Sequence, residues 1–253
     1  MIGRVAAVIY GLASYLVFTL SFAYMIGFVG NYLVPKSIDV GSAGESGLAQ
    51  SILIDAALLA VFAIQHSVMA RPAFKRWWTR IVPDSCERST YVLISSLLLI
   101  LMFWQWRLIT TTIWRVEGWP AAILTAIFSL GWLIGLASTH MIDHFELFGL
   151  RQVFGALRGG AARVALFKTP LLYRLVRHPL MLGLLLAFWA TPHMTAGHLL
   201  FAVLTTAYIF VGTRLEERDL VAQFGATYER YRQRVPMLLP RLFAGGSVTS
   251  ETR

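Results

Sequence analysis

Six apolar segments, separated by polar or basic loops, constrain the fold of this chain more than any other feature of its sequence. A helix needs about 20 mainly apolar residues to cross the hydrocarbon core of a membrane. The segments are residues 5–29, 48–69, 91–106, 120–140, 179–191 and 197–213. Only 14% of the 253 residues are charged, against about 25% in soluble proteins. We therefore expect an all-α integral membrane protein with about six transmembrane helices.

The fifth segment is short, and only residues 192–196 separate it from the sixth. We expect these two segments to form a tight helical hairpin at the C-terminal end of the membrane region. Such a hairpin would bring its two outer ends, near residues 178 and 216, to the same side of the membrane.

The basic residues predict the orientation of the chain. With six spans and the N-terminus inside, 19 of the 22 Lys and Arg residues lie on one side of the membrane and three on the other. Positive residues accumulate on the cytoplasmic side. The net charge of +9 is then explained by membrane topology, so we expect no nucleic-acid partner. Both termini and the polar residues at the ends of the fifth and sixth segments should face the cytoplasm.

The chain is expected to form one membrane-embedded domain over residues 1–240, with a flexible tail at 241–253. Residues 214–240 alternate charges with apolar side chains, and Leu220, Phe224, Tyr228 and Tyr231 recur at helical spacing. This pattern predicts a cytoplasmic amphipathic tail helix. The single cysteine, Cys86, excludes an intrachain disulfide, and the sequence contains no HExxH or paired CxxC pattern, so no metal site is predicted.

Two charged motifs stand at the ends of the expected hairpin. Arg177, His178 and Pro179 precede the fifth segment, and Glu216 and Glu217 follow the sixth. Ionisable groups at membrane helix ends are costly unless they have partners or a ligand. We expect His178 and Glu216 to be neighbours that could hold a cationic or zwitterionic ligand through charge-assisted hydrogen bonds. The alternative is a simple helix start with Pro at its first position and a solvated helix end.

Polar residues at two other span ends could complete this site. His66 lies near the cytoplasmic end of the second segment, and Asp143 and His144 follow the fourth. A histidine titrates near neutral pH and can serve as a base. Interfacial solvation of a helix end explains each motif equally well when it is taken alone.

The C-terminal third of the chain resembles a known family. The segments RHPLMLG, EERDL and FGATYERYRQRVP, with the final Pro240, are similar over roughly residues 165–240 to the isoprenylcysteine carboxyl methyltransferase family. Its members are integral membrane enzymes that use S-adenosyl-L-methionine. The segments GFVGNYLVPKSID, QHSVMARPAFKRWW, ERSTYVL, FWQWR and DHFELFGLRQV resemble a narrower bacterial branch that methylates a small thiol, methanethiol, to dimethyl sulfide.

The resemblance implies a cofactor site and a substrate preference. The positions that match the cofactor-binding motif are Tyr173, His178, Pro179, Leu180, Met181 and Glu216. The family's His-x-Leu-Val segment is not preserved at residues 165–168. The arginine that the family uses for the carboxylate of prenylcysteine is replaced by Gly212, as expected for a thiol substrate.

For the transfer itself, the nucleophile must be a thiolate. We expect His66 or His144 to act as the base, with Asp143 orienting one of them, or Arg177 to stabilise the thiolate electrostatically. Two other functions remain open. One is that of a non-enzymatic, NnrU-like membrane protein of nitrogen-oxide metabolism. The other is an NADPH-dependent membrane reductase, for which Arg230, Arg232 and Arg234 could hold a 2′-phosphate.

Overall fold

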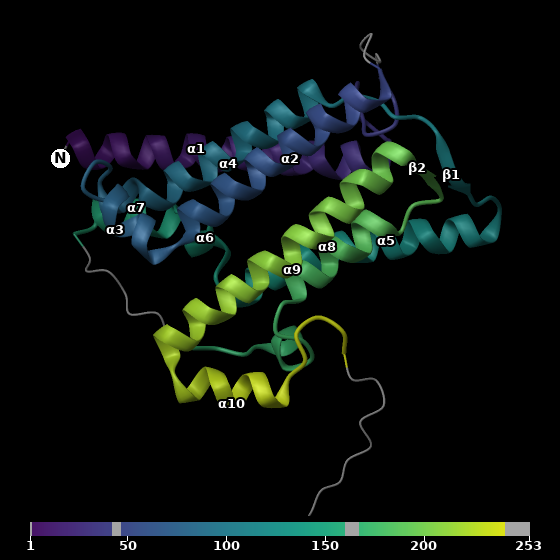
Figure 1. Ribbon diagram of the computed structural model, residues 1–253. Helices are drawn as coiled ribbons and strands as arrows, with labels where there is room; N and C mark the ends of the chain where they lie inside the picture. Colours follow the sequence, from purple (N-terminus) through teal and green to yellow (C-terminus); the bar gives the residue numbers. More distant parts are fainter. Residues whose placement is uncertain (1, 42–46, 160–166, 241–253) are drawn as a thin grey trace, which may run out of the picture.

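The computed structural model describes residues 2–41, 47–159 and 167–240, and within these ranges the chain is a bundle of helices (Figure 1). Among the described residues, five helices are long and apolar enough to cross a membrane. They are α1 (Ile2–Gly30), α2 (Leu48–Ala70), α4 (Asp84–Gln105), α5 (Trp119–Ile142) and α9 (Ala196–Phe224). The expected all-α integral membrane fold is therefore confirmed. The predicted tail at 241–253 and part of the segment at 165–168 lie outside the described residues.

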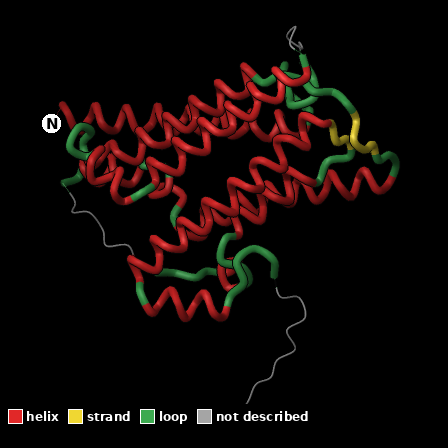
Figure 2. Tube along the Cα trace, viewed as in Figure 1, coloured by secondary structure: helices red, strands yellow, loops and turns green. Residues whose placement is uncertain are grey.

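Shorter elements connect these helices. They are α3 (Pro72–Trp78), β1 (Thr112–Arg115), α6 (His144–Leu147), α7 (Leu150–Leu157), η1 (Leu171–Arg174), α8 (Pro179–Trp189), β2 (His193–Thr195) and α10 (Ala226–Arg234). Strands β1 and β2 pair antiparallel at one end of the bundle (Figure 2). We call this the strand end. The opposite end, where α2, α5 and α9 finish and α8 begins, is called the basic end.

The fifth apolar segment, residues 179–191, does not form a complete membrane helix. Helix α8 has 11 residues and is therefore about 17 Å long, against a hydrocarbon thickness of about 30 Å. Residues 190–192 are not helical and lead into β2, where Met194 and Thr195 are buried. Non-helical backbone is tolerated at membrane depth only when protein surrounds it. The pairing of β2 with β1 and the burial of this segment meet that condition.

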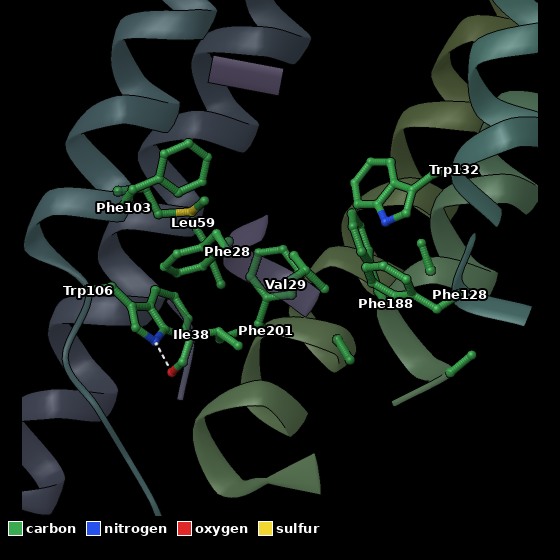
Figure 3. Packing of buried hydrophobic residues seen from close by; sticks show 14 of the residues in the cluster. Phe28, Val29, Ile38, Leu59, Phe103, Trp106, Phe128, Trp132, Phe188 and Phe201 are labelled. Atoms are coloured by element: carbon green, nitrogen blue, oxygen red, sulfur yellow. Dashed lines mark hydrogen bonds between the residues drawn. The ribbon is translucent and has the colours of Figure 1, made fainter. Parts of the chain in front are cut away.

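Large aromatic and aliphatic side chains fill the centre of the bundle (Figure 3). Phe28 of α1 packs on Phe103 of α4 and meets Trp106 edge to face, and Phe201 of α9 meets Phe188 of α8 in the same way. The indole of Trp106 donates a hydrogen bond to the carbonyl of Ile38. This core joins the first four membrane segments to the C-terminal hairpin.

A polar cluster fastens the loop after α1 to the strand end. Asp39 accepts hydrogen bonds from Asn31 (2.7 Å) and Thr195, and the Nδ1 atom of buried His198 lies 3.6 Å from its carboxylate. Burial alone would raise the pKa of Asp39, but the nearby His198 and the hydrogen bonds from Thr195 and Asn31 hold that pKa below the ordinary value. The cluster was not predicted from the sequence.

The amphipathic pattern over residues 214–240 is divided between two helices. Helix α9 runs without interruption from Ala196 to Phe224, and Gly225, with φ of +54°, ends it. A positive φ favours glycine because it has no Cβ, and the chain then turns into α10. The expected aromatic face is nevertheless kept across the turn. The rings of Phe224 in α9 and of Tyr228 and Tyr231 in α10 all contact the ring of Phe167.

Glycine lets α5 and α8 approach until their backbones touch. A Cβ atom added to Gly183 would lie 2.5 Å from the carbonyl oxygen of Gly131, and one added to Gly131 would lie 2.6 Å from the carbonyl oxygen of Gly183. Small residues permit this kind of close helix contact in membranes. Helix α8 packs more extensively on α5 than on α9, so this contact holds the short helix in place.

We expect Gly131→Ala and Gly183→Ala to lower the thermal stability of the purified protein in detergent. Each methyl group would press on backbone that cannot move aside, at a cost of about 1–3 kcal/mol. Gly135→Ala is the matched control, because its Cβ would meet only Leu180 at an ordinary 3.5 Å. Equal melting temperatures for all three variants would contradict the close contact.

Candidate active site

A buried ion pair joins the start of α8 to α9 at the basic end. The Oε1 atom of Glu217 accepts a hydrogen bond from Nε of Arg177 at 2.6 Å and lies 3.1 Å from Nε2 of His178. The Arg177 and Glu217 side chains are only 9% and 10% exposed. Two partners on one oxygen compensate for removing the carboxylate from water. Pro179 then begins α8, where its missing N–H leaves no donor unsatisfied.

The chain after α10 closes over this pair. The Nη1 atom of Arg177 donates to the carbonyl oxygens of Arg232 (2.8 Å) and Val235 (2.6 Å). The backbone N–H groups of Arg177 and His178 donate to the carbonyl oxygens of Pro236 and Met237. The Nε and Nη1 donors of Arg177 are therefore engaged within the protein, which favours a structural role over the predicted contact with a thiolate.

Glu216 and His178 are neighbours, as the hairpin predicted. The Oε2 atom of Glu216 lies 3.8 Å from Nδ1 of His178, and the Glu216 side chain is 48% exposed. That distance is too long for a hydrogen bond, so the carboxylate can accept hydrogen bonds from a ligand. The closer partner of His178 is Glu217, which the sequence analysis did not predict. No sequence signal separated it from Glu216; the structure buries it on the same face of α9 as Ile209 and Thr213.

Three tyrosines surround these charged groups. The hydroxyl of Tyr173 donates weakly to the carbonyl of Ser138 at 3.5 Å. Burial, and then the negative charge of Glu216, raise its pKa. Burial raises the pKa of Tyr231 to about 12, and its hydroxyl donates to the Tyr173 carbonyl. The hydroxyl of buried Tyr228 has no hydrogen-bond partner within the described residues.

The remaining predicted cofactor positions, Leu180 and Met181, lie in the first turn of α8. Leu180 lies against α5, next to Gly135. Met181 packs against the central hydrophobic core. Both side chains therefore contact the protein interior, and a ligand at the basic end would meet this turn mainly through its backbone and through His178.

His66 lies between α2 and α4 with both ring nitrogens hydrogen-bonded. Its Nε2 atom is 2.7 Å from the hydroxyl of Tyr91, and its Nδ1 atom is 3.2 Å from the hydroxyl of Ser95. The ring also stacks on Phe62 and meets Tyr208 of α9 edge to face. The structure therefore brings His66 to the side of α9 that carries Glu216, but through Tyr208.

His144 lies apart from this group, between α5 and α1. Its Nε2 atom is 2.8 Å from the hydroxyl of Tyr15, and its Nδ1 atom is 2.9 Å from the hydroxyl of Thr139. Burial, and then the neighbouring His140, lower its pKa. The carboxylate of Asp143 is directed elsewhere: one oxygen accepts from the backbone of Glu146, and the other pairs with Arg151. Asp143 therefore caps a helix, which does not favour the predicted orienting role.

No group of three or more His, Cys, Asp or Glu side chains suited to a metal occurs in the part of the chain that the structure describes. The groups gathered at the basic end are a free carboxylate, an imidazole and several phenol hydroxyls. Such a set suits a ligand that carries ammonium and hydroxyl donors together with a carboxylate acceptor.

Comparison with known proteins found one family and several relatives that match this chain. The family described as NnrU protein matches residues 54–237. The chain is 63% identical to methanethiol S-methyltransferase 2 of Bradyrhizobium diazoefficiens, over 96% of this chain and 93% of that protein. It is 56% identical to methanethiol S-methyltransferase of Mycobacterium tuberculosis over 94% of this chain and 97% of that protein. Nurim of Mus musculus is 31% identical over 70% of each chain. No solved structure matches.

Proposed function

This chain belongs to the NnrU protein family, and we propose that it is a membrane-embedded methyltransferase that converts methanethiol to dimethyl sulfide with S-adenosyl-L-methionine as the methyl donor. Its similarity to named methanethiol S-methyltransferases over nearly the whole chain supports both the reaction and the substrate. The structural observation that carries the proposal is the half-exposed Glu216 carboxylate beside His178, on a platform fixed by the buried Arg177–Glu217 pair.

The residues at the basic end fit the proposed donor chemically. When bound, S-adenosyl-L-methionine supplies an electrophilic methyl group on a positively charged sulfur. Glu216 would accept hydrogen bonds from the hydroxyl or ammonium groups of the cofactor, and the phenol of Tyr173 would donate a hydrogen bond to the cofactor. The orphaned hydroxyl of Tyr228 is a third group that a ligand could satisfy, because a buried hydroxyl without a partner costs about 1–3 kcal/mol.

The protein's part in the transfer is to hold the thiol as a thiolate in a place that water does not reach. Opposite charges attract far more strongly in a low-dielectric site than in water, so a thiolate is favoured beside a cationic ligand. Gly212 contributes to substrate selection because it has no side chain. A buried carboxylate without a cationic partner would cost several kcal/mol, and Gly212 provides no such partner, which disfavours carboxylate substrates.

We propose that the basic end faces the cytoplasm of a bacterium, where the methyl donor is made. Its support is the uneven distribution of Lys and Arg residues. Reporter fusions at Arg80, Gly159 and Pro240 should then report the cytoplasm, and a fusion at Gly118 the periplasm. A periplasmic signal at Pro240 would reverse the orientation and reject this location for the site.

The cofactor proposal predicts that His178→Ala and Glu216→Ala each weaken S-adenosyl-L-methionine binding. A hydrogen bond to a charged group contributes roughly 1.5–3 kcal/mol, which corresponds to about a tenfold to hundredfold change in Kd. Isothermal titration of the purified variants measures this change. Glu217→Ala should have the smaller direct effect on binding and should instead lower thermal stability, because it leaves Arg177 buried without its partner.

Two outcomes would argue against this assignment. Wild-type affinity in both His178→Ala and Glu216→Ala would show that these residues only solvate a helix end. Tight NADPH binding in a parallel titration, with none of S-adenosyl-L-methionine, would favour the reductase instead.

The substrate proposal predicts that membranes containing the protein form dimethyl sulfide from methanethiol and S-adenosyl-L-methionine. Headspace gas chromatography measures the product. If His66 or His144 is the base, the corresponding alanine variant should lose activity while still binding the cofactor. Full activity in both variants would remove the two histidines from the mechanism, and a folded, cofactor-binding protein that forms no dimethyl sulfide would reject the substrate.

The pH profile tests His144 as the base. Because burial lowers the pKa of His144, this ring stays neutral, and therefore competent as a base, to a pH below its ordinary titration range. If His144 is the base, activity should rise with pH as the thiol ionises and show no separate histidine step near neutral pH. Such a step in the wild type that His144→Ala abolishes would contradict the lowered pKa.

A further inference from the structure

Two apolar cavities follow the contact between α2 and α9. The one nearer the strand end has a volume of about 410 Å³ and is lined in part by Ile52 and Leu200. The inner cavity has a volume of about 350 Å³, roughly ten times the volume of about 30 Å³ that one water molecule occupies in the liquid. The lining residues that matter here are Ala56, Ala60 and Ala63 of α2 and Leu204, Thr205 and Tyr208 of α9.

Alanine creates the inner cavity. The three alanines lie on one face of α2 at spacings of four and three, so their small side chains leave a groove along that face. Ala60 is exposed although it lines the cavity. The groove therefore opens on the outer surface of the bundle, which faces lipid in a membrane protein.

The inner cavity ends at a polar aromatic cluster. Tyr208 lines it, is hydrogen-bonded to Ser67, and lies edge-on to both Phe62 and His66. The cavity is thus mainly apolar, because the hydroxyl of Thr205 donates within α9, and it ends at the Tyr208 ring where α2 approaches the basic end. A ligand with an alkyl part and one polar atom would fit, with the alkyl part in the apolar cavity and the polar atom at its Tyr208 end.

A row of residues on α9 connects the cavity to the proposed cofactor site. Leu204, Tyr208, Gly212 and Glu216 are four residues apart and share one face of the helix. A Cβ atom added to Gly212 would meet only Tyr208, at 3.9 Å. The surface between the cavity and the Glu216 carboxylate is therefore open, over about two helical turns.

We propose that the inner α2–α9 cavity holds the alkyl group of the thiol, with its sulfur toward Tyr208 and Gly212, and that Ala60 and Ala63 set the largest alkyl group accepted. This inference rests on the proposed function. The continuous row from the cavity to Glu216 favours a small thiol as the occupant over a lipid acyl chain, which would not need a polar end.

The test compares alkanethiols of increasing length, from methanethiol to 1-butanethiol, in the wild type and in Ala60→Phe and Leu204→Ala. Ala60→Phe should lower kcat/KM for 1-butanethiol by about tenfold to a hundredfold more than for methanethiol, the range expected from steric exclusion in an apolar pocket. Leu204→Ala should shift the preference toward the longer thiols. The Kd for S-adenosyl-L-methionine should stay within about twofold in both variants.

Ala57→Phe is the matched control, because it makes the same substitution at an exposed position of α2 that does not line the cavity. Its thiol profile should match the wild type. A general folding defect lowers activity toward all thiols equally, so the change in relative preference identifies the cavity.

An active wild type whose length profile is the same in all variants would overturn the cavity assignment and leave the proposed function intact. In that case the groove holds lipid only. A wild type that binds S-adenosyl-L-methionine but methylates no thiol would overturn the proposed function, and the cavity assignment with it.

Discussion

The buried Glu217 carboxylate is the interaction on which the basic end of this protein depends. One of its oxygens meets both Arg177 and His178, and the Nη1 atom of Arg177 binds the carbonyl oxygens of Arg232, in α10, and Val235, just after it. A single buried charge therefore fixes three pieces of chain relative to one another. Removing one partner of such a pair is costly because the other charge stays buried. That rigidity leaves the adjacent Glu216 exposed and free to bind a ligand.

The short helix α8 makes this arrangement possible. It crosses only part of the membrane thickness as a helix, and buried extended backbone completes the distance to the strand end. The glycine contact between Gly131 and Gly183 presses α8 onto α5, which positions His178 against α9. With α8 drawn toward α5, α9 remains available to pack with α2, and the apolar groove lies along that second contact.

Several features of the site could be predicted and others could not. The Arg177–His178 and Glu216–Glu217 motifs were expected to meet, and they do. The sequence did not distinguish which glutamate is buried, because adjacent residues on a helix differ by about 100° and only packing decides which one faces inward. His66 and His144 were expected to join one site. Instead each is hydrogen-bonded to a tyrosine on a different helix, Tyr91 and Tyr15.

The sequence by itself determined the membrane environment, the number and position of the apolar segments, and the family resemblance that led to a small thiol. These follow from composition, from hydropathy and from local motifs, all of which depend on residues close together in the chain. Tertiary structure decided what depends on contacts between distant segments: the extended completion of the α8 crossing, the break at Gly225, the pairing of β1 with β2, and the groove between α2 and α9. Each of these is set by packing, since the local sequence allows several conformations and burial selects one of them.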